Sequence, residues 1–281
     1  GTLLTVRVSG AGGSVTSRAA TLTVKAWGAN VLATTGVSYS SPYQLALDAS
    51  GAKLYVAMGG NGSVYRIDTA SGSGAEVTPG ATLTTPSGLA LAADGTLYVS
   101  DQHRISKIAA NATTASTWVG GATSGYADSP ATVMFHNPTG LALDSGGNLF
   151  VADTENKRVR KVAADGTTST LAGDGTQAYL DGVGTAAQLA RPQGLAISRD
   201  GKTLYDTDTD SPCLRKIDIA TATVSTLLGD CANGNAGAGY STNGADDPYA
   251  YIYGGSGGFS WFEGALGGKG SAYGGFGGGG G

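Results

Sequence analysis

The stretch Pro138-Thr139-Gly140-Leu141-Ala142-Leu143 is written four times in this chain, with small changes. The other copies begin at Pro42, Pro86 and Pro192, so consecutive copies start 44, 52 and 54 residues apart. Each copy is followed by a turn and then by a second apolar strand, as in Leu149-Phe150-Val151. A repeat of this length, made of short strands, is typical of the blades of a β-propeller.

Four strands are expected in each repeat, and the third copy shows them most clearly. Alternating apolar residues and tight turns there predict strands over residues 140–144, 148–152, 158–163 and 168–172. The turn Asp165-Gly166 separates the last two strands, because glycine accepts the positive φ that tight hairpins need. The chain is therefore expected to be all-β, with four legible propeller blades over residues 27–245.

The third copy also resembles the NHL repeat along its whole length. The resemblance rests on Asn137-Pro138-Thr139-Gly140-Leu141-Ala142-Leu143-Asp144 and on residues 147–162, which run from Gly-Asn-Leu-Phe-Val-Ala-Asp to Arg-Val-Arg-Lys-Val. NHL propellers usually close with six blades, whereas four copies are legible here. Either sequence outside this chain completes a six-bladed ring, or the protein is a four-bladed or open arc.

The two flanks resemble other families. Residues 1–26 alternate as a β-hairpin and resemble the end of a bacterial-type immunoglobulin-like surface domain. Residues 246–281 contain Gly257-Gly258-Phe259-Ser260-Trp261-Phe262-Glu263-Gly264 and resemble the start of the glycine-rich domain of anaplastic-lymphoma-kinase-type receptors. That resemblance implies packed glycine helices, and a flexible glycine linker is the alternative that composition allows.

Composition excludes some classes of partner. Charged residues make up 14% of the chain and the net charge is −4, so a basic surface for nucleic acid is not expected. No apolar run reaches the length of about 18 residues that a membrane span needs. The first residues lack the charged region and cleavage site of a signal peptide, and both ends are abrupt. We interpret the chain as a segment of a longer multi-domain protein or a mature chain.

The two cysteines, Cys213 and Cys231, begin and follow two strands of one predicted hairpin. The pattern places them opposite each other on neighbouring strands, within the Cα distance of about 7 Å that a disulfide requires. Two free thiols are the alternative. A disulfide would indicate an oxidising, extracellular-type compartment.

The densest acidic cluster is Asp206-Thr207-Asp208-Thr209-Asp210. Three alternating carboxylates could bind calcium, which prefers oxygen ligands, although the EF-hand pattern fails because no glycine occupies its sixth position. The same pattern also suits the outward face of a strand that ends in an Asx turn. Calcium is thus the one cofactor that the sequence suggests.

A second candidate site is the loop of the third copy that carries Asp153, Asn156 and Arg158. Asp and Asn can accept and donate to the backbone of the turn, which is a structural role, or the three side chains can contact a ligand. The histidines His103 and His136 lie on different blades, and each is expected to be an isolated loop residue. Metal-dependent lyases on similar propellers use several inward-facing histidines.

Two glycosylation sequons, Asn61-Gly62-Ser63 and Asn111-Ala112-Thr113, fall in predicted loops or turns. An acceptor asparagine must be exposed, which such positions allow. Asn61 lies at the loop position equivalent to Asn156, so its side chain could instead cap the turn.

Together these features predict a non-enzymatic structural or adhesive segment of an extracellular surface or filament protein. Its partners would be proteins or glycans, other copies of the chain or neighbouring domains, reached through sheet edges or loops. A propeller-type metal-dependent lyase or lactonase is one alternative, with metal held by residues such as Asp153 and Asp208. A ligand-binding module of a receptor ectodomain is the other, and it rests on the glycine-rich resemblance alone.

Overall fold

A computed structural model of the chain describes residues 2–4, 7–10, 13–16, 20–22, 36–38, 40–78, 83–128, 132–210 and 213–229. The chain divides into two compact units, Gly1–Ala33 and Thr34–Gly281. In the described ranges the regular structure is almost entirely β-strand, and none of their helices is long and apolar enough to cross a membrane. The predicted glycine-rich domain, residues 246–281, lies outside the described residues.

The described residues of the first unit form two short antiparallel strand pairs, one nested inside the other in sequence. Strand β1 (Thr2–Leu4) pairs with β4 (Ala20–Leu22), and β2 (Arg7–Gly10) pairs with β3 (Gly13–Thr16). This agrees with the hairpin expected from the alternating residues. Its assignment to an immunoglobulin-like domain stays a prediction.

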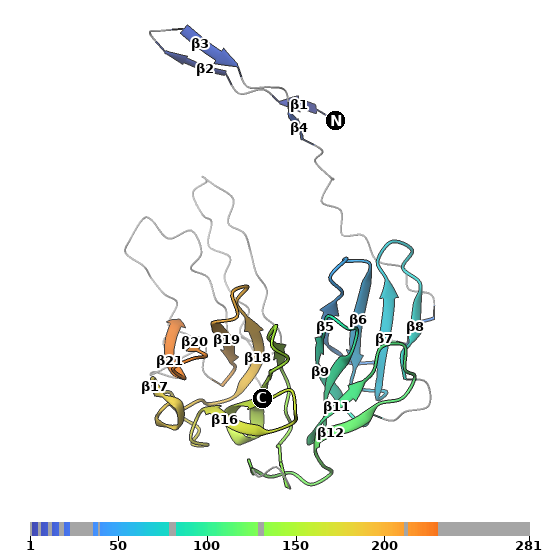
Figure 1. Cartoon of the computed structure of the whole chain (residues 1–281), viewed down its shortest axis with the longest axis vertical. Helices are drawn as coiled ribbons and strands as arrows, with labels where there is room; N and C mark the ends of the chain where they lie inside the picture. Colours follow the sequence, from blue (N-terminus) through green and yellow to red (C-terminus); the bar gives the residue numbers. More distant parts are fainter. Residues whose placement is uncertain are drawn as a thin grey trace, which may run out of the picture. The chain divides into compact units, whose positions relative to one another are not determined.

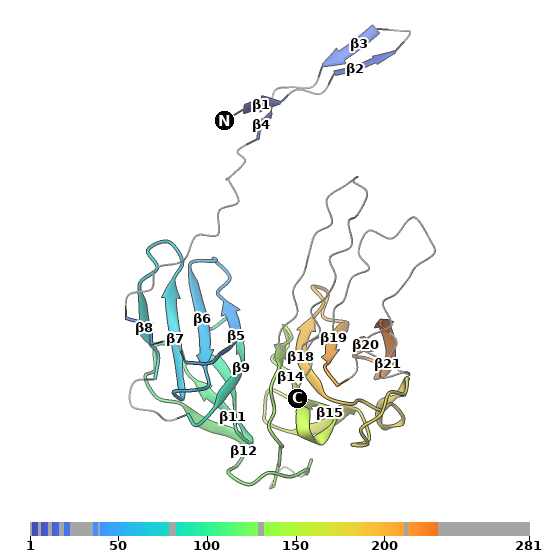
Figure 2. The same ribbon diagram turned by 180° about the vertical axis from the view of Figure 1, so that it is seen from behind.

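The described residues of the second unit form four antiparallel sheets, one for each copy of the repeat (Figures 1 and 2). Blade 1 comprises β5 (Pro42–Leu47), β6 (Lys53–Met58), β7 (Ser63–Asp68) and β8 (Gly74–Glu76). Blade 2 comprises β9 (Pro86–Leu91), β10 (Leu97–Asp101), β11 (Arg104–Ile108) and β12 (Ser116–Gly120). Blade 3 comprises β13 (Leu141–Leu143), β14 (Leu149–Asp153), β15 (Arg158–Val162) and β16 (Thr168–Ala172).

Blade 4 comprises β18 (Pro192–Ile197), β19 (Thr203–Asp208), β20 (Cys213–Asp218) and β21 (Thr223–Leu228). The short strand β17 (Gly182–Val183) adds to its outer edge by pairing with β21. Two single-turn 3₁₀ segments, η1 (Thr154–Asn156) and η2 (Gly184–Ala186), interrupt the connections. Within every blade the strands pair in chain order, which confirms the four predicted blades.

The first strands of successive blades lie against one another, in the order β5, β9, β13 and β18. The glycine of the repeated phrase is needed at two of these contacts, whereas blade 1 has Gln44 at this position. Gly140 N–H donates to the carbonyl of Gln193 in the next blade at 2.7 Å, and a Cβ on Gly140 would collide with that carbonyl. A Cβ on Gly88 would likewise collide with the carbonyl of Thr139 in the next blade. The phrase therefore encodes close contact between neighbouring blades.

The hydrophobic core lies between the blades, and the same kinds of residue face each other at each described contact. Each of blades 1 to 3 turns a small residue and an aromatic residue toward the next blade, which covers them with leucines of its own first two strands. Between blades 3 and 4, for example, Ala142 and Phe150 pack with Leu195 and Leu204. The same relation holds between blades 2 and 3 for Ala90, Tyr98, Leu141 and Leu149, and between blades 1 and 2 for Ala46, Tyr55, Leu89 and Leu97.

One buried position breaks this apolar pattern. Asp206 pairs with Leu195 as Val151 pairs with Leu141, so it stands where blade 3 has a valine. Its side chain is fully buried, and neither carboxylate oxygen has a hydrogen-bond partner among the described residues. Burial, and then the charge of Asp208, raise the pKa of Asp206 well above its ordinary value, while the charge of Arg215 and the nearby backbone N–H of Gln193 oppose the rise.

Replacing Asp206 by valine is expected to raise the free energy of unfolding by about 1–3 kcal/mol at neutral pH, because an unpaired buried polar group disappears. The folded-state pKa of Asp206 is raised above its unfolded value of about 3.9. The native protein is therefore most stable below that pH, where Asp206 is protonated in both states, and it loses stability as pH rises and the buried carboxyl must ionise. Urea unfolding at pH 4 and pH 7 should therefore show a larger gain at pH 7.

The matched control is Asp208→Val, two residues away on the same face of β19. The carboxylate of Asp208 accepts the N–H groups of Ala190 at 2.7 Å and Arg191 at 2.5 Å, so its loss should destabilise the protein. If Asp206→Val lowered stability as Asp208→Val does, the carboxylate of Asp206 would have partners that this account lacks.

Candidate functional site

The most repeated polar feature is an aspartate at the end of the second strand of blades 2, 3 and 4. Asp101, Asp153 and Asp208 are buried, and each accepts backbone N–H groups from the loop that precedes the first strand of its own blade. The donors are Thr84 and Thr85 at 2.7 Å, His136 at 2.8 Å, and Ala190 and Arg191. In blade 1 the equivalent residue is Met58. These carboxylates hold loops in place.

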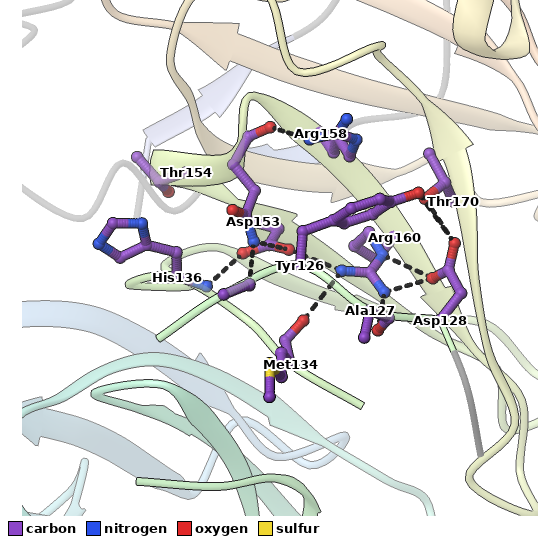
Figure 3. A network of polar contacts seen from close by, with 12 residues as sticks. Tyr126, Ala127, Asp128, Met134, His136, Asp153, Thr154, Arg158, Arg160 and Thr170 are labelled. Carbon is purple, nitrogen blue, oxygen red and sulfur yellow. Dashed lines mark hydrogen bonds and ion pairs between the residues drawn. The ribbon is translucent and has the colours of Figure 1, made fainter. Parts of the chain in front are cut away.

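In blade 3 this aspartate belongs to a larger network around Arg160 (Figure 3). The guanidinium of Arg160 is fully buried and forms ion pairs with Asp153 at 2.8 Å and with Asp128. It also donates to the carbonyls of Ala127 at 2.8 Å and Met134 at 3.2 Å. Burial raises the pKa of Asp153, and the N–H of His136 and the Arg160 charge oppose that rise. The network ties the connection between blades 2 and 3 to strand β15.

The predicted interaction loop lies beside this network, and its polar groups are engaged within the blade. Asn156 Nδ2 donates to Asp153 at 2.8 Å and to the carbonyl of Gly125 at 2.7 Å. Arg158 lies over the ring of Tyr126, 3.8 Å from its centre, and donates to the carbonyl of Asn156 at 2.8 Å. The geometry favours the structural interpretation of this loop, and a ligand-binding role stays a prediction.

We call a buried arginine that holds the preceding connection through an aspartate and a backbone carbonyl a clamp, and blade 4 has one as well. Arg215 is fully buried and donates to Asp181 at 2.8 Å and to the carbonyl of Leu180 at 3.2 Å. The two connections that are similar in sequence, 125–128 and 179–182, therefore each supply an aspartate carboxylate and a backbone carbonyl to an equivalent buried arginine. Sequence reasoning matched these connections but missed Arg160 and Arg215. The feature that could have revealed them is an arginine at the same position of the third strand in both blades 3 and 4.

The structure does not bring the three aspartates of residues 206–210 together as a calcium site. Asp208 binds backbone amides, and Asp210 accepts a hydrogen bond from Gln177 Nε2 at 2.9 Å and lies 3.8 Å from Arg191. Asp206 is enclosed between blades. Within the described part of the chain, no group of three or more His, Cys, Asp or Glu side chains is placed to hold a metal ion.

The two histidines, expected to be isolated, lie side by side. The ring centres of His103 and His136 are 5.6 Å apart in an edge-to-face arrangement, and Asn137 N–H donates to His103 Nδ1 at 3.3 Å. Burial, and then the neighbouring His136, lower the pKa of His103. The contact arises because the turn after Asp101 adjoins the loop before Pro138. Neighbouring blades therefore place side chains together that are far apart in sequence.

The remaining predicted sites are only partly described. Cys213 is buried at the start of β20, whereas Cys231 lies outside the described residues, so their disulfide stays a prediction. Asn61 is partly buried, and its Nδ2 donates to the carbonyl of Ser38 at 3.4 Å. Asn111 is exposed in a turn with φ of 63°. Of the two sequons, Asn111 is the more accessible.

Substituting Arg160 by methionine is expected to lower the free energy of unfolding by about 3–5 kcal/mol, since the charge of Asp153 would remain buried without its partner. The control is Lys161→Met, because Lys161 is partly exposed and forms no ion pair with the described residues. Chemical denaturation followed by circular dichroism measures both. Equal losses in the two variants would contradict the clamp.

Oxidised protein is expected to carry a bridge between Cys213 and Cys231. Alkylation in denaturant should label no thiol before reduction and two thiols after it, as read by intact mass. Reduction should cost about 3 kcal/mol of stability, the value for a loop of this size. Two labelled thiols in unreduced protein would show that the cysteines are free.

Known proteins share this architecture. The family model of the NHL repeat matches residues 135–162, within blade 3 and the loop before it. Protein SUPPRESSOR OF QUENCHING 1, chloroplastic, of Arabidopsis thaliana is 28% identical over 208 residues, which is 64% of this chain and 19% of that protein. The chain thus spans about a fifth of the length of this relative.

Two solved structures from Bacteroides thetaiotaomicron VPI-5482 are similar in fold. A structural genomics protein of unknown function has a TM-score of 0.55 at 22% identity over 66% of this chain and 47% of that one. An auxiliary nutrient binding protein has a TM-score of 0.54 at 15% identity over 67% of this chain and 47% of that one. With the four described blades and the NHL match, these findings show an all-β protein with an NHL-type β-propeller.

Proposed function

We propose that this chain is a non-enzymatic structural segment of a larger extracellular surface or filament protein. The propeller is a rigid scaffold that joins a second copy of the chain through the faces that blades 1 and 4 leave open among the described residues. The observation that carries the proposal is the exposure, on blade 1, of Leu45, whose equivalents are buried in every other described blade.

Leu45 and Leu47 of β5 are 57% and 56% exposed, and Tyr43 on the same strand is 68% exposed. The equivalents of Leu45 in the other blades are between 2% and 7% exposed: Leu89, Leu141 and Leu195. Those leucines are covered by the small and aromatic residues of the preceding blade. On blade 1 no described blade precedes them. A contiguous apolar strand face of this kind marks an interaction surface.

The opposite end of the series offers the complementary surface. In blade 4, Ala196 is exposed and Tyr205 is partly exposed, at the positions where Ala142 and Phe150 cover the next blade. Leu227, on the outer strand β21, is 45% exposed. The forward face of blade 4 therefore has the composition that covers a leucine face at three internal contacts. Burying one leucine side chain stabilises a complex by about 1.5–3 kcal/mol.

Other features of the chain also support the proposal. The Asp–Arg clamps give each of the later blades a rigid frame, which suits a scaffold. The predicted disulfide supports an extracellular compartment, and the resemblances of the two flanks support an extended surface protein. The net charge of −4 favours a protein partner over nucleic acid.

The double variant Leu45→Asp/Leu47→Asp is expected to abolish concentration-dependent self-association of the chain. Sedimentation velocity over a hundredfold range of concentration measures this directly. The unfolding midpoint should change little, because both side chains are exposed. The control Ser116→Asp/Thr117→Asp adds the same charge on exposed positions of β12 and should associate as the native chain does.

Two results would contradict the proposal. A native chain that stays monomeric across the whole range would remove the proposed contact between copies. A stoichiometric, tightly held metal found by elemental analysis would favour the lyase or lactonase alternative over a structural role.

A further inference from the structure

A groove of about 360 Å³ opens between blades 1 and 2, on the side of their outer strands. Its walls include Tyr55 and Arg66 from blade 1 and the turn that follows β11 in blade 2. Its floor is apolar and includes Val77, Leu97 and Ile108, of which the last two are 2% exposed. This volume falls at the small end of the range of about 300–1,000 Å³ for ligand pockets.

The groove exists because one large side chain is missing. Between blades 2 and 3, the corresponding residues are Tyr98 and Lys107, which pair across β10 and β11 as Tyr55 and Arg66 pair across β6 and β7. Trp118 packs there against Tyr98, with ring centres 5.1 Å apart, and Lys107 Nζ lies 3.6 Å from the indole centre. An aromatic ring held by a cation therefore occupies that space.

In blade 1 the residue equivalent to Trp118 is Val77. Val77 follows Glu76, the partner of Tyr65, as Trp118 follows Thr117, the partner of Ser106. The aromatic and the cation of this arrangement, Tyr55 and Arg66, are kept, while the ring between them is absent. Since interiors are close-packed, the exchange of an indole for an isopropyl group leaves space for a ring from elsewhere.

The charges around the groove indicate what the ring should carry. Arg66 and Lys53 both line it, both are exposed, and neither forms an ion pair with a described residue. Lys53 lies two residues before Tyr55 on β6, hence on the same face of the strand. The one acidic lining residue, Glu76, accepts a hydrogen bond from Ser63 Oγ at 2.5 Å. Lys53 also interacts electrostatically with Asp48 and Asp68 of blade 1, neither of which lines the groove. The described lining itself therefore carries two cations against one engaged carboxylate.

We propose that the groove between blades 1 and 2 binds an aromatic carboxylate. The ring lies over Val77 and Leu97 beside Tyr55, with the guanidinium of Arg66 on its face, as Lys107 lies on Trp118 in the next blade. The carboxylate pairs with Lys53. Cation–π contact and charge pairing supply orientation, and the apolar floor supplies most of the affinity. A free aromatic acid and the C-terminal tryptophan of a peptide share this chemistry.

The test is a titration of the chain with indole-3-acetate, monitored by the chemical shifts of backbone amides in proton–nitrogen correlation NMR spectra. Saturable shifts are expected at residues of the groove, with affinity that falls as salt is raised. Uncharged indole should bind at least tenfold more weakly. A peptide that ends in tryptophan, compared with its C-terminal amide, tells whether a peptide can be the source. Asn111 lies at the rim, so the protein is made without glycosylation.

Three variants make the test specific. Val77→Trp gives blade 1 the residue that fills this space in blade 2, so it should abolish binding and keep or raise the melting temperature. Arg66→Gln should weaken binding at least tenfold. The control Lys161→Gln changes the equivalent cation of blade 3, which lies outside the groove, and should bind as the native chain does.

The proposal fails if indole-3-acetate gives no saturable shifts up to millimolar concentration, or if folded Val77→Trp binds it as well as the native chain. Equal binding of indole and indole-3-acetate would remove the carboxylate from the proposal. Shifts confined to residues outside the groove would also overturn it. None of these outcomes depends on whether the chain self-associates.

Discussion

The contact between a leucine face and a small-plus-aromatic face is the interaction on which this molecule depends. Each blade is a thin four-stranded sheet that cannot bury its apolar residues alone, so its stability comes from the blades on either side. The repeated phrase encodes the contact directly. In blades 2 and 3 its glycine admits the carbonyl of the next blade, while its leucine faces the preceding blade and its alanine makes room for the following one. Any blade without a neighbour must expose one of these faces.

Polar clamps complement the apolar contact and differ from blade to blade. Blade 3 has the full set, in which Arg160 joins Asp153 to Asp128. In blade 2 the aspartate pairs with Arg104 at 2.6 Å, closer to the surface. Blade 1 has Met58 instead. Since a buried charge is tolerated only when it is paired and hydrogen-bonded, the clamps specify where each connection crosses its blade more than they add stability.

The blades could be predicted because the repeat is local: alternation and turns place four strands within each copy. The clamps could not, because Asp128 and Arg160 are 32 residues apart and meet only after the blade has formed. The same reason hid the contact of His103 with His136. Sequence reasoning also assigned Asp206 to a possible ligand set, although its alignment with Val151 places it in the core. Position within the repeat was the better guide to the role of a side chain than its chemical type.

Departures from the repeat at packing positions explain where this chain has surface to offer. Where Trp118 is replaced by Val77, a groove opens, and its charged rim survives because Arg66 keeps the place of Lys107. Where no described blade precedes β5, the leucine face is left open. Where Asp206 replaces a valine, the buried carboxyl lowers the stability of the core and creates no binding surface. A packing residue that is lost at the rim or at an end of the series creates a binding surface, whereas the same loss between two intact blades only lowers stability. The position of a departure, rather than its size, therefore determines whether it can serve function.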